Sequence, residues 1–322
     1  MTIETPPAAV DKFARAFEKL SSDKSTSPEW IKSLREKAWS AFSNLGLPTK
    51  RRGNELWKYT NLRPLADLEF SYGSSGSVTA EQIKCAGPWD DAWDTLVVVD
   101  GKFSSELSSL NGTTGLRATS LASAIESSEG DVESQLASLA GKEEYAFTAL
   151  STAFVDDGAY VSLGDGSELE QPVHVIFVTS GASESRAVYP RLLMNAGVGS
   201  SMTLIETHLN LADTPQFSAP VIEILQDGGS AIRHYRVQME NEASFHIGTT
   251  RVSQQGDTDF TSTSFAVGAQ IARNDVHTLL DAPGANCTLH GLYMTNGSQH
   301  QDQEISTTHA KPGGSSDQFY KG

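Results

Sequence analysis

Cysteine is almost missing from this chain, which has two cysteines, Cys85 and Cys287, among 322 residues. A secreted protein that depends on disulfides usually carries several pairs, whereas a protein of a reducing compartment needs none. The two cysteines lie far apart in the sequence, and no Cys-x-x-Cys pair occurs. We therefore predict a cytoplasmic protein without a disulfide framework.

Basic residues and long apolar runs are also scarce. The chain has 24 basic and 40 acidic residues and a formal net charge of −16, which repels the phosphates of nucleic acids and the anionic surface of membranes. No apolar run reaches the length of about 18 residues that a membrane helix needs. Residues 1–9 lack the basic patch and apolar stretch of a signal peptide. We expect no nucleic-acid partner and no membrane association.

The common catalytic motifs are missing as well. The sequence has no Gly-x-x-x-x-Gly-Lys phosphate loop, no Gly-x-Ser-x-Gly elbow and no His-Glu-x-x-His pair. An iron–sulfur cluster is usually held by about four thiolates, and two cysteines cannot supply them. We expect no cofactor held by this chain alone, and we assign no catalytic residue.

Residues 1–70 predict a helical lobe. Apolar residues recur there at helical spacing, namely Val10, Phe13, Phe17 and Leu20. A second helix has clear ends, because Ser27 suits the N-cap, Pro28 the first helical position and Gly46 the C-terminal αL position.

Residues 71–158 predict a mixed α/β connecting region. Thr95–Val99 is typical of a buried strand, and Asp100-Gly101 after it is a hairpin signal. Short helices are expected from Leu121 and from Val132, and a longer helix over residues 143–154.

Residues 159–322 carry almost no helical period and instead predict strands at intervals of roughly 11–18 residues. The expected strands are Val173–Thr179, Arg191–Met194, Met202–Leu209, Pro220–Gln226, Ala231–Met239, Phe245–Val252, Asp259–Val267, Cys287–Met294 and Glu304–His309. A sandwich, a barrel and a solenoid could each hold such a series. Short side chains on both strand faces, the scarcity of Asn-Gly hairpins and the lack of a crossover helix favour a solenoid of stacked turns, a parallel β-helix.

The β region offers weak candidates for metal ligands, which are His300, Asp302, His309 and Cys287. His300, Asp302 and Glu304 alternate, so in a strand they share one face, which could bind a divalent metal or simply be a polar face in solvent. Cys287 lies on a strand face that looks interior, where a free thiol packs as a small apolar group. We assign no metal site. The other histidines are expected to be hydrogen-bonded structural residues, namely His174, His208, His234, His246, His277 and His290.

Acidic residues leave one enzymatic alternative open. Pairs of carboxylates on a β-helix can cleave polysaccharides, and four aspartates lie near the expected turns, namely Asp257, Asp259, Asp275 and Asp281. Aspartate is also common as a turn-capping residue. A β-helix polysaccharide lyase or hydrolase is therefore the alternative interpretation.

Two segments resemble a known family. The segment Glu55–Thr60, with its lead-in Leu47–Arg51, is similar to the Glu-x-Trp-Lys-Tyr-Thr segment that follows the N-terminal helices of SufD-type proteins. The segment Arg273–Gly322 resembles the core of the SufB/SufD family in the order and spacing of its motifs. These motifs are Asn296-Gly297-x-Gln299-His300-x-Asp302, His309, Ser315-Ser316 and Tyr320-Lys321-Gly322. The first segment favours the SufD type.

The resemblance implies a right-handed parallel β-helix flanked by helical parts. It also implies a non-catalytic scaffold subunit of the SUF machinery, which assembles iron–sulfur clusters. Such a subunit pairs with a SufB-like subunit and binds a SufC-like ATPase through its C-terminal helices. An iron–sulfur cluster is then expected only transiently, at the interface with the partner subunit in the full complex.

The resemblance also raises an expectation about the C-terminal end. Family members continue past Lys321-Gly322 with further turns and a helical tail that carries a Cys-x-His segment. We therefore expect a β-helix core over residues 159–322 that is incomplete at its C-terminal end, and we expect this chain not to bind the ATPase that the full-length protein binds.

Overall fold

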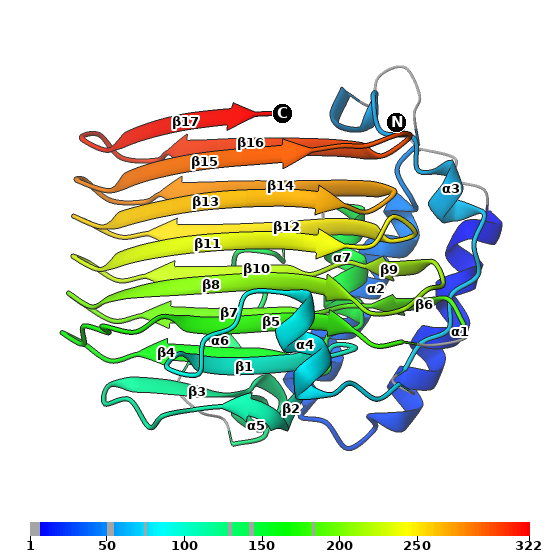
Figure 1. Ribbon diagram of the computed structural model, residues 1–322, viewed down its shortest axis with the longest axis horizontal. Coiled ribbons are helices and arrows are strands. Elements are labelled where there is room, and N and C mark those ends of the chain that lie inside the picture. The colour runs from blue at the N-terminus through cyan, green and yellow to red at the C-terminus, as the bar shows by residue number, and fades with distance from the viewer. Residues whose placement is uncertain (1–6, 50–54, 74–75, 128–130, 142–144, 182–183) are drawn as a thin grey trace.

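The computed structural model describes residues 7–49, 55–73, 76–127, 131–141, 145–181 and 184–322. A stack of β-strands stands beside a group of helices (Figure 1). The helices are α1 Pro7–Asp23, α2 Glu29–Leu45, the short 3₁₀ helix η1 Glu55–Trp57, α3 Arg63–Ala66, α4 Ala80–Ala86, α5 Leu121–Glu126, α6 Val132–Gln135 and α7 Ala146–Ala153. The mainly β fold with a small N-terminal helical lobe is confirmed.

The strands form two sheets that face each other. Their bounds are β1 Asp94–Val99, β2 Lys102–Ser109, β3 Leu116–Ser120, β4 Ala159–Leu163, β5 Val173–Thr179, β6 Arg186–Val188, β7 Arg191–Ala196, β8 Ser201–Asn210, β9 Gln216–Ser218, β10 Val221–Gln226, β11 Ala231–Glu240, β12 Phe245–Gln254, β13 Asp259–Gly268, β14 Ile271–Leu280, β15 Asn286–Met294, β16 His300–His309 and β17 Ser315–Lys321. The front sheet has the order β17-β15-β13-β11-β8-β5-β1-β2, and the helix-side sheet has the order β16-β14-β12-β10-β7-β4-β3.

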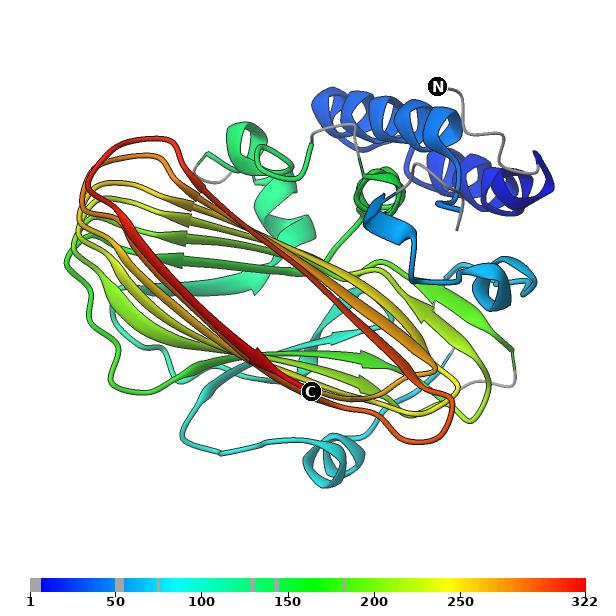
Figure 2. The ribbon, with the colours of Figure 1, turned by 90° about the horizontal axis from the view of Figure 1, so that it is seen from above.

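The two sheets are the walls of a parallel β-helix. Each turn places one strand in each sheet, and register partners in successive turns lie 27 to 30 residues apart, as the series Ser201, Ala231, Asp259, Asn286 and Ser315 shows. Seen from the C-terminal end, the chain winds counter-clockwise as it rises toward the viewer, which is the right-handed sense (Figure 2). The predicted solenoid is confirmed, and its uneven period explains why no exact repeat is visible in the sequence.

The solenoid interior holds an apolar core and a buried polar cluster. The apolar core extends from Leu96 and Val175 in the lower turns to Phe260 and Leu289 in the upper ones. The polar cluster is formed by Glu206, His208, His234, Arg236, Glu240 and His246. Each carboxylate of this cluster has a partner, because Glu206 contacts two histidines and Arg236 while Glu240 contacts His246. Such pairing is what makes buried charges tolerable.

His174 makes stability depend on pH. Its side chain is fully buried, its Nε2 atom lies 2.8 Å from Thr207 Oγ1, and burial lowers its pKa to about 3. The unfolded chain binds a proton on this residue below about pH 6.5, whereas the folded chain does not until about pH 3. Stability is therefore lost as the pH falls from 6.5 toward 3. Between pH 7 and 5 we expect the wild type to lose about 2 kcal/mol more than His174→Gln, measured by urea unfolding at both values.

The matched control for this prediction is His290→Gln, because His290 is exposed on the outer face of β15. This variant should lose as much stability as the wild type over the same range. Equal pH dependence of His174→Gln and the wild type would contradict the assignment of His174.

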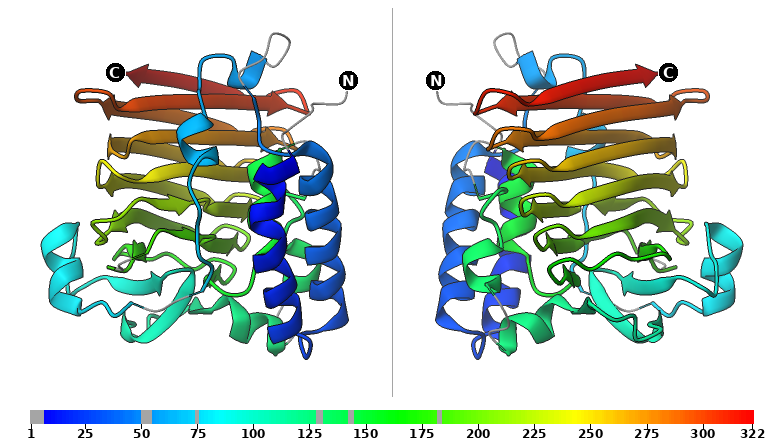
Figure 3. Two further views of the ribbon diagram at one scale, coloured as in Figure 1. Left: turned by 90° about the vertical axis from the view of Figure 1, so that its right-hand side faces the viewer. Right: turned by 90° about the vertical axis from the view of Figure 1, so that its left-hand side faces the viewer.

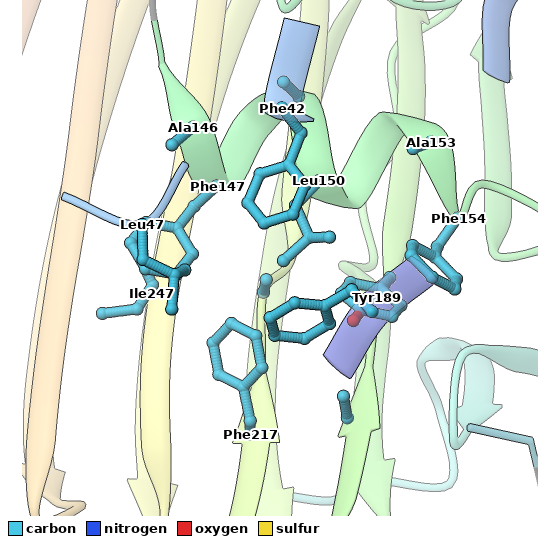
Figure 4. Close-up of a cluster of buried hydrophobic side chains, with 14 of the residues drawn as sticks. Phe42, Leu47, Ala146, Phe147, Leu150, Ala153, Phe154, Tyr189, Phe217 and Ile247 are labelled. Atoms are coloured by element: carbon cyan, nitrogen blue, oxygen red, sulfur yellow. The ribbon is translucent and has the colours of Figure 1, made fainter. Parts of the chain in front are cut away.

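The helical lobe packs on the outer face of the helix-side sheet. Helices α1 and α2 run along the stacking direction (Figure 3), and Phe13, Phe17 and Leu20 are buried as their spacing predicts. Contacts between aromatic rings connect the lobe, through α7, to the sheet. Phe17 of α1 meets Phe154, the C-cap residue of α7, with ring centroids 6.0 Å apart. Phe154 stacks on Tyr189 at 4.5 Å, and Phe147 of α7 meets Phe217 of β9 at 5.8 Å (Figure 4).

The ends of α2 differ in two details from the expectation. The N-cap is Pro28 and makes no side-chain capping bond, so the assignment of Ser27 was wrong by one residue. Ser27 Oγ instead accepts a hydrogen bond from Arg35 Nη1 at 3.2 Å, which takes its hydroxyl away from the capping role. Gly46 closes the helix with a φ of 63° and a ψ of −176°, so the αL conformation predicted for it was wrong although its φ is positive.

The connecting region contains the predicted hairpin. Strands β1 and β2 pair antiparallel, and Asp100 and Gly101 between them have φ values of 50° and 81°, which the left-handed turn of a tight hairpin requires. Helices α5 and α6 begin at the two predicted residues, and α7 lies within the predicted range, although Glu143 and Glu144 lie outside the described residues. No strand was predicted at β3, β4, β6, β9, β14 or β17, and β2 was implied only by the hairpin signal.

Candidate functional site where residues 55–63 meet the β-helix

Arg273 is the centre of a polar junction on the helix-side sheet. It lies in β14, and only 2% of its side chain is exposed. Its Nε donates to Asp275 Oδ1 at 2.7 Å, and its Nη1 donates to Asp302 Oδ2 at 2.5 Å and to the Leu56 carbonyl at 2.7 Å. The guanidinium also lies 4.2 Å from the ring centroid of Trp57. One arginine thus joins two strands to η1.

The Trp-Lys-Tyr-Thr segment completes this junction. Thr60 is buried, its hydroxyl donates to Asp302, and its Oγ1 lies 3.0 Å from His300 Nε2. Glu304 approaches Arg273 at 3.8 Å. His300, Asp302 and Glu304 therefore share one face of β16, as their alternation predicts. That face contacts Arg273 and Thr60, so the two segments that carry the family resemblance touch each other.

The other two weak metal candidates lie elsewhere. Cys287 is buried in the solenoid interior, its Sγ is 3.5 Å from Thr278 Oγ1, and burial raises the pKa of its thiol to about 11. His309 is exposed at the end of β16, with Nε2 2.9 Å from Ser316 Oγ. The structure therefore brings His300 and Asp302 together and separates both from Cys287 and His309. No group of three or more His, Cys, Asp or Glu side chains suited to a metal ion occurs within the described residues.

Arg273 faces three carboxylates at the junction, those of Asp275, Asp302 and Glu304. Burial raises the pKa of Asp275 to about 6, and the charges of Arg273 and Arg251 oppose that shift. Asp302 and Glu304 are partly exposed and face the same guanidinium. Arg273 is already bonded to the carboxylates of this junction. The junction is therefore suited to holding residues 55–63 against the β-helix.

A second buried ion pair on the same sheet was not found from the sequence. Glu223 of β10 is fully buried and pairs with Arg191 of β7. Its carboxylate also accepts hydrogen bonds from the backbone amides of Ala137, Leu139 and Ala140 at 2.9–3.0 Å. These bonds hold Ala137 at a φ of 63°, a left-handed conformation that alanine rarely adopts. Aligning successive turns would have placed Glu223 beside its register partner Arg251, which in turn pairs with His277.

The four aspartates of the polysaccharide alternative do not form one group. Asp281 follows β14 and its amide donates to the Gln254 carbonyl at 2.9 Å, near the turn that holds Asp257. Asp257 and Asp259 are exposed at the start of β13, whereas Asp275 is buried in the middle of β14 in the other sheet and bonded to Arg273. Asp275 thus lies inside a strand and not near a turn.

Among the residues that the structure describes, no helix is long and apolar enough to cross a membrane.

Comparison with known proteins identifies the family. The model of the SufBD protein N-terminal region matches residues 10–175, and the model of the SufBD core domain of SUF-system iron–sulfur cluster assembly matches residues 177–322. The chain belongs to the SufB/SufD family. The matches include both the 55–63 segment and the strands that it contacts, and the family belongs to the SUF system of iron–sulfur cluster assembly.

Individual relatives agree with the family. An iron–sulfur cluster assembly SufBD family protein of Synechocystis is 24% identical over the whole chain and 72% of its own length. The iron–sulfur cluster assembly protein SufD of Escherichia coli is 24% identical over 86% of this chain, which spans 62% of that SufD. A chloroplastic protein of Arabidopsis thaliana is 22% identical over 54% of this chain and 38% of its own length.

Proposed function

We propose that this chain is a SufD-like, non-catalytic scaffold subunit that pairs with a SufB-like subunit and, in its full-length form, with a SufC-like ATPase. The family membership supports a role in iron–sulfur cluster assembly. The SufD character is supported by the Trp57–Thr60 segment and by the E. coli SufD among the relatives. Nothing in the structure favours the polysaccharide alternative.

The number and state of the cysteines favour a cluster whose ligands come in part from a partner subunit. A cluster usually needs about four thiolates, and the chain has two cysteines. Cys85 is exposed and lies in α4, while Cys287 is buried with a raised pKa, and a thiol with a raised pKa is a poor ligand because metals bind the thiolate. A cluster on this chain would therefore need ligands from another subunit.

The observation that carries the proposal is an apolar surface on the upper front sheet. Five large apolar side chains point outward there with exposed fractions of 39–64%, namely Tyr235, Met239, Leu292, Met294 and Phe319. Strand register places them in adjoining rows across β11, β13, β15 and β17. Lower on the same face, α4 covers the sheet through Ile83. Exposed aromatic and methionine side chains in one patch are typical of protein interfaces.

Co-purification tests the proposal. The full-length protein should form a complex with SufB-like and SufC-like proteins of the same organism. Leu292→Asp and Phe319→Asp should each weaken the SufB-like complex at least about tenfold, because they place a charge in a buried interface. Val198→Asp is the control, since Val198 is 56% exposed in the turn between β7 and β8, away from the apolar surface.

The possible outcomes test the proposed function and the proposed interface separately. Failure of the wild type to bind either protein would overturn the proposed function. Normal binding by Leu292→Asp and Phe319→Asp would keep the function and reject this surface as the interface.

The cytoplasmic location stays a prediction, and the Arabidopsis relative is named as chloroplastic.

A further inference from the structure

A cavity lies on the helix-side sheet between β12, β14, β16 and the residues before α7. Its volume is about 370 Å³, within the range of about 300–1,000 Å³ typical of small-molecule sites. Its wall combines apolar residues such as Leu139 and Val252 with polar ones, namely Tyr145, Thr148, Arg251, His277, Ser306 and Thr308. None of these residues belongs to the apolar surface of the front sheet, so a role for this cavity is independent of the proposed function.

Arg251 brings a buried positive charge to this cavity. The residue is 6% exposed, and its Nη1 donates to the backbone carbonyls of Thr250 and Asp275, both at 3.1 Å. Its guanidinium lies 5.0 Å from the ring centroid of Tyr145. Its Nη2 is buried and has no hydrogen-bond partner within the described residues. Buried donors of this kind nearly always have a partner.

Two neighbouring arginines on the same sheet form ion pairs with carboxylates, whereas Arg251 does not. Arg191 is paired with Glu223, and Arg273 is paired with Asp275 and Asp302. Arg251 forms no ion pair with any carboxylate in the described part of the chain. The acids closest to it are thus already bonded to other arginines. Asp275 and Glu223 favour the charged form of Arg251, but burial outweighs them and lowers its pKa. A buried charge without a directly bonded counterion is unfavourable, and a bound anion would offset that cost.

His277 adds a second donor beside Arg251. The two residues are register partners on β14 and β12, and the His277 ring lies 5.3 Å from that of Tyr145. Its Nε2 is buried without a partner among the described residues. Burial, with help from Arg251 and Arg273, lowers the His277 pKa to about 4, so the ring is neutral near pH 7 and can donate from Nε2. The hydroxyl of Ser306, the register partner of His277 on β16, adds a third polar group.

We propose that this cavity is a binding site for a small oxyanion, the phosphate or carboxylate group of a metabolite-sized molecule, held by Arg251 and His277. The guanidinium supplies the charge and a free N–H, the imidazole supplies a second N–H, and the hydroxyls of Ser306 and Thr308 complete the polar wall. Arginine suits both groups because its donors match the geometry of either oxyanion.

Isothermal titration calorimetry of the full chain with inorganic phosphate and, separately, with acetate tests the site. We expect saturable binding of at least one anion by the wild type. Arg251→Gln should weaken it at least about tenfold through loss of the charge-assisted bonds. Ser306→Phe should also abolish it by filling the cavity, and it leaves Arg251 in place should Arg251→Gln fail to fold. Arg63→Gln is the control, because the Arg63 side chain is 83% exposed on α3.

The two anions distinguish the ligand classes. Binding of phosphate alone assigns a phosphate-bearing ligand, and binding of acetate alone assigns a carboxylate-bearing one. The proposal is overturned if neither anion binds more tightly than a Kd of about 10 mM, or if Ser306→Phe binds as the wild type does.

Discussion

Replacing Arg273 with glutamine is expected to lower the free energy of unfolding by about 3–5 kcal/mol, because breaking a buried ion pair leaves a charge without a partner. Asp275 would lose its cation inside β14, and Leu56 would lose the donor to its carbonyl. The ring of Trp57 would lose the guanidinium stacked on it. Urea unfolding of the variant and the wild type measures the difference.

Two further variants give this measurement its controls. Arg63→Gln removes an exposed arginine whose pair with Asp67 is 3.5 Å long, and it should change stability by less than about 0.5 kcal/mol. Arg273→Gln combined with Asp275→Asn should recover part of the loss, since the two residues interact directly. A loss below about 1 kcal/mol for Arg273→Gln would show that Arg273 does not hold the junction together.

Replacing Glu223 with glutamine is expected to be about as damaging, with a loss of about 3–5 kcal/mol. The change leaves Arg191, whose side chain is 1% exposed, without an anion. It also weakens the hydrogen bonds from the amides of Ala137, Leu139 and Ala140. Those amides should exchange with solvent deuterium much faster than in the wild type, while amides of β1 keep their protection.

The control for Glu223 is Glu242→Gln, because Glu242 is exposed in the turn between β11 and β12. This variant should match the wild type in urea unfolding and in hydrogen exchange. Unchanged exchange at residues 137–140 in Glu223→Gln would contradict the role given to its carboxylate.

The fold was predictable wherever one strand face is apolar. Val173–Thr179 was predicted with the same bounds as β5, because all seven of its residues are buried and five of them are apolar. Strand β14 was missed because Arg273, Asn274 and Asp275 are consecutive polar residues that occupy both faces. What buries them is the helical lobe on one side and the solenoid interior on the other. Neither covering layer is visible in the local sequence.

The C-terminal strand β17 was missed for a different reason. Its residues are mostly polar and exposed, so Ser315–Lys321 shows no apolar period. The strand exists because its backbone pairs with β15, with Asn286 opposite Ser315 at one end and Leu292 opposite Lys321 at the other. In a solenoid the preceding turn is a template for the next one, and register then matters more than the hydrophobic pattern.

The candidate site was predictable only in part. Alternation alone put His300 and Asp302 on one face. Their contact with Thr60 spans about 240 positions of the sequence, and only the docking of the helical lobe on the sheet brings these residues together. Arg251 could not be selected from the sequence either, because what distinguishes it from Arg191 and Arg273 is the carboxylate that it lacks in the folded chain.

Anaerobic reconstitution tests the central claim most directly, namely that this protein is a scaffold that does not hold an iron–sulfur cluster by itself. The full-length protein is incubated with ferrous iron, sulfide and a thiol reductant, then desalted, and its iron and sulfide are measured. A mixture with the SufB-like and SufC-like proteins serves as the positive control. The account predicts that the isolated protein retains neither iron nor sulfide while the mixture retains both. Stoichiometric iron and sulfide on the isolated protein would contradict it.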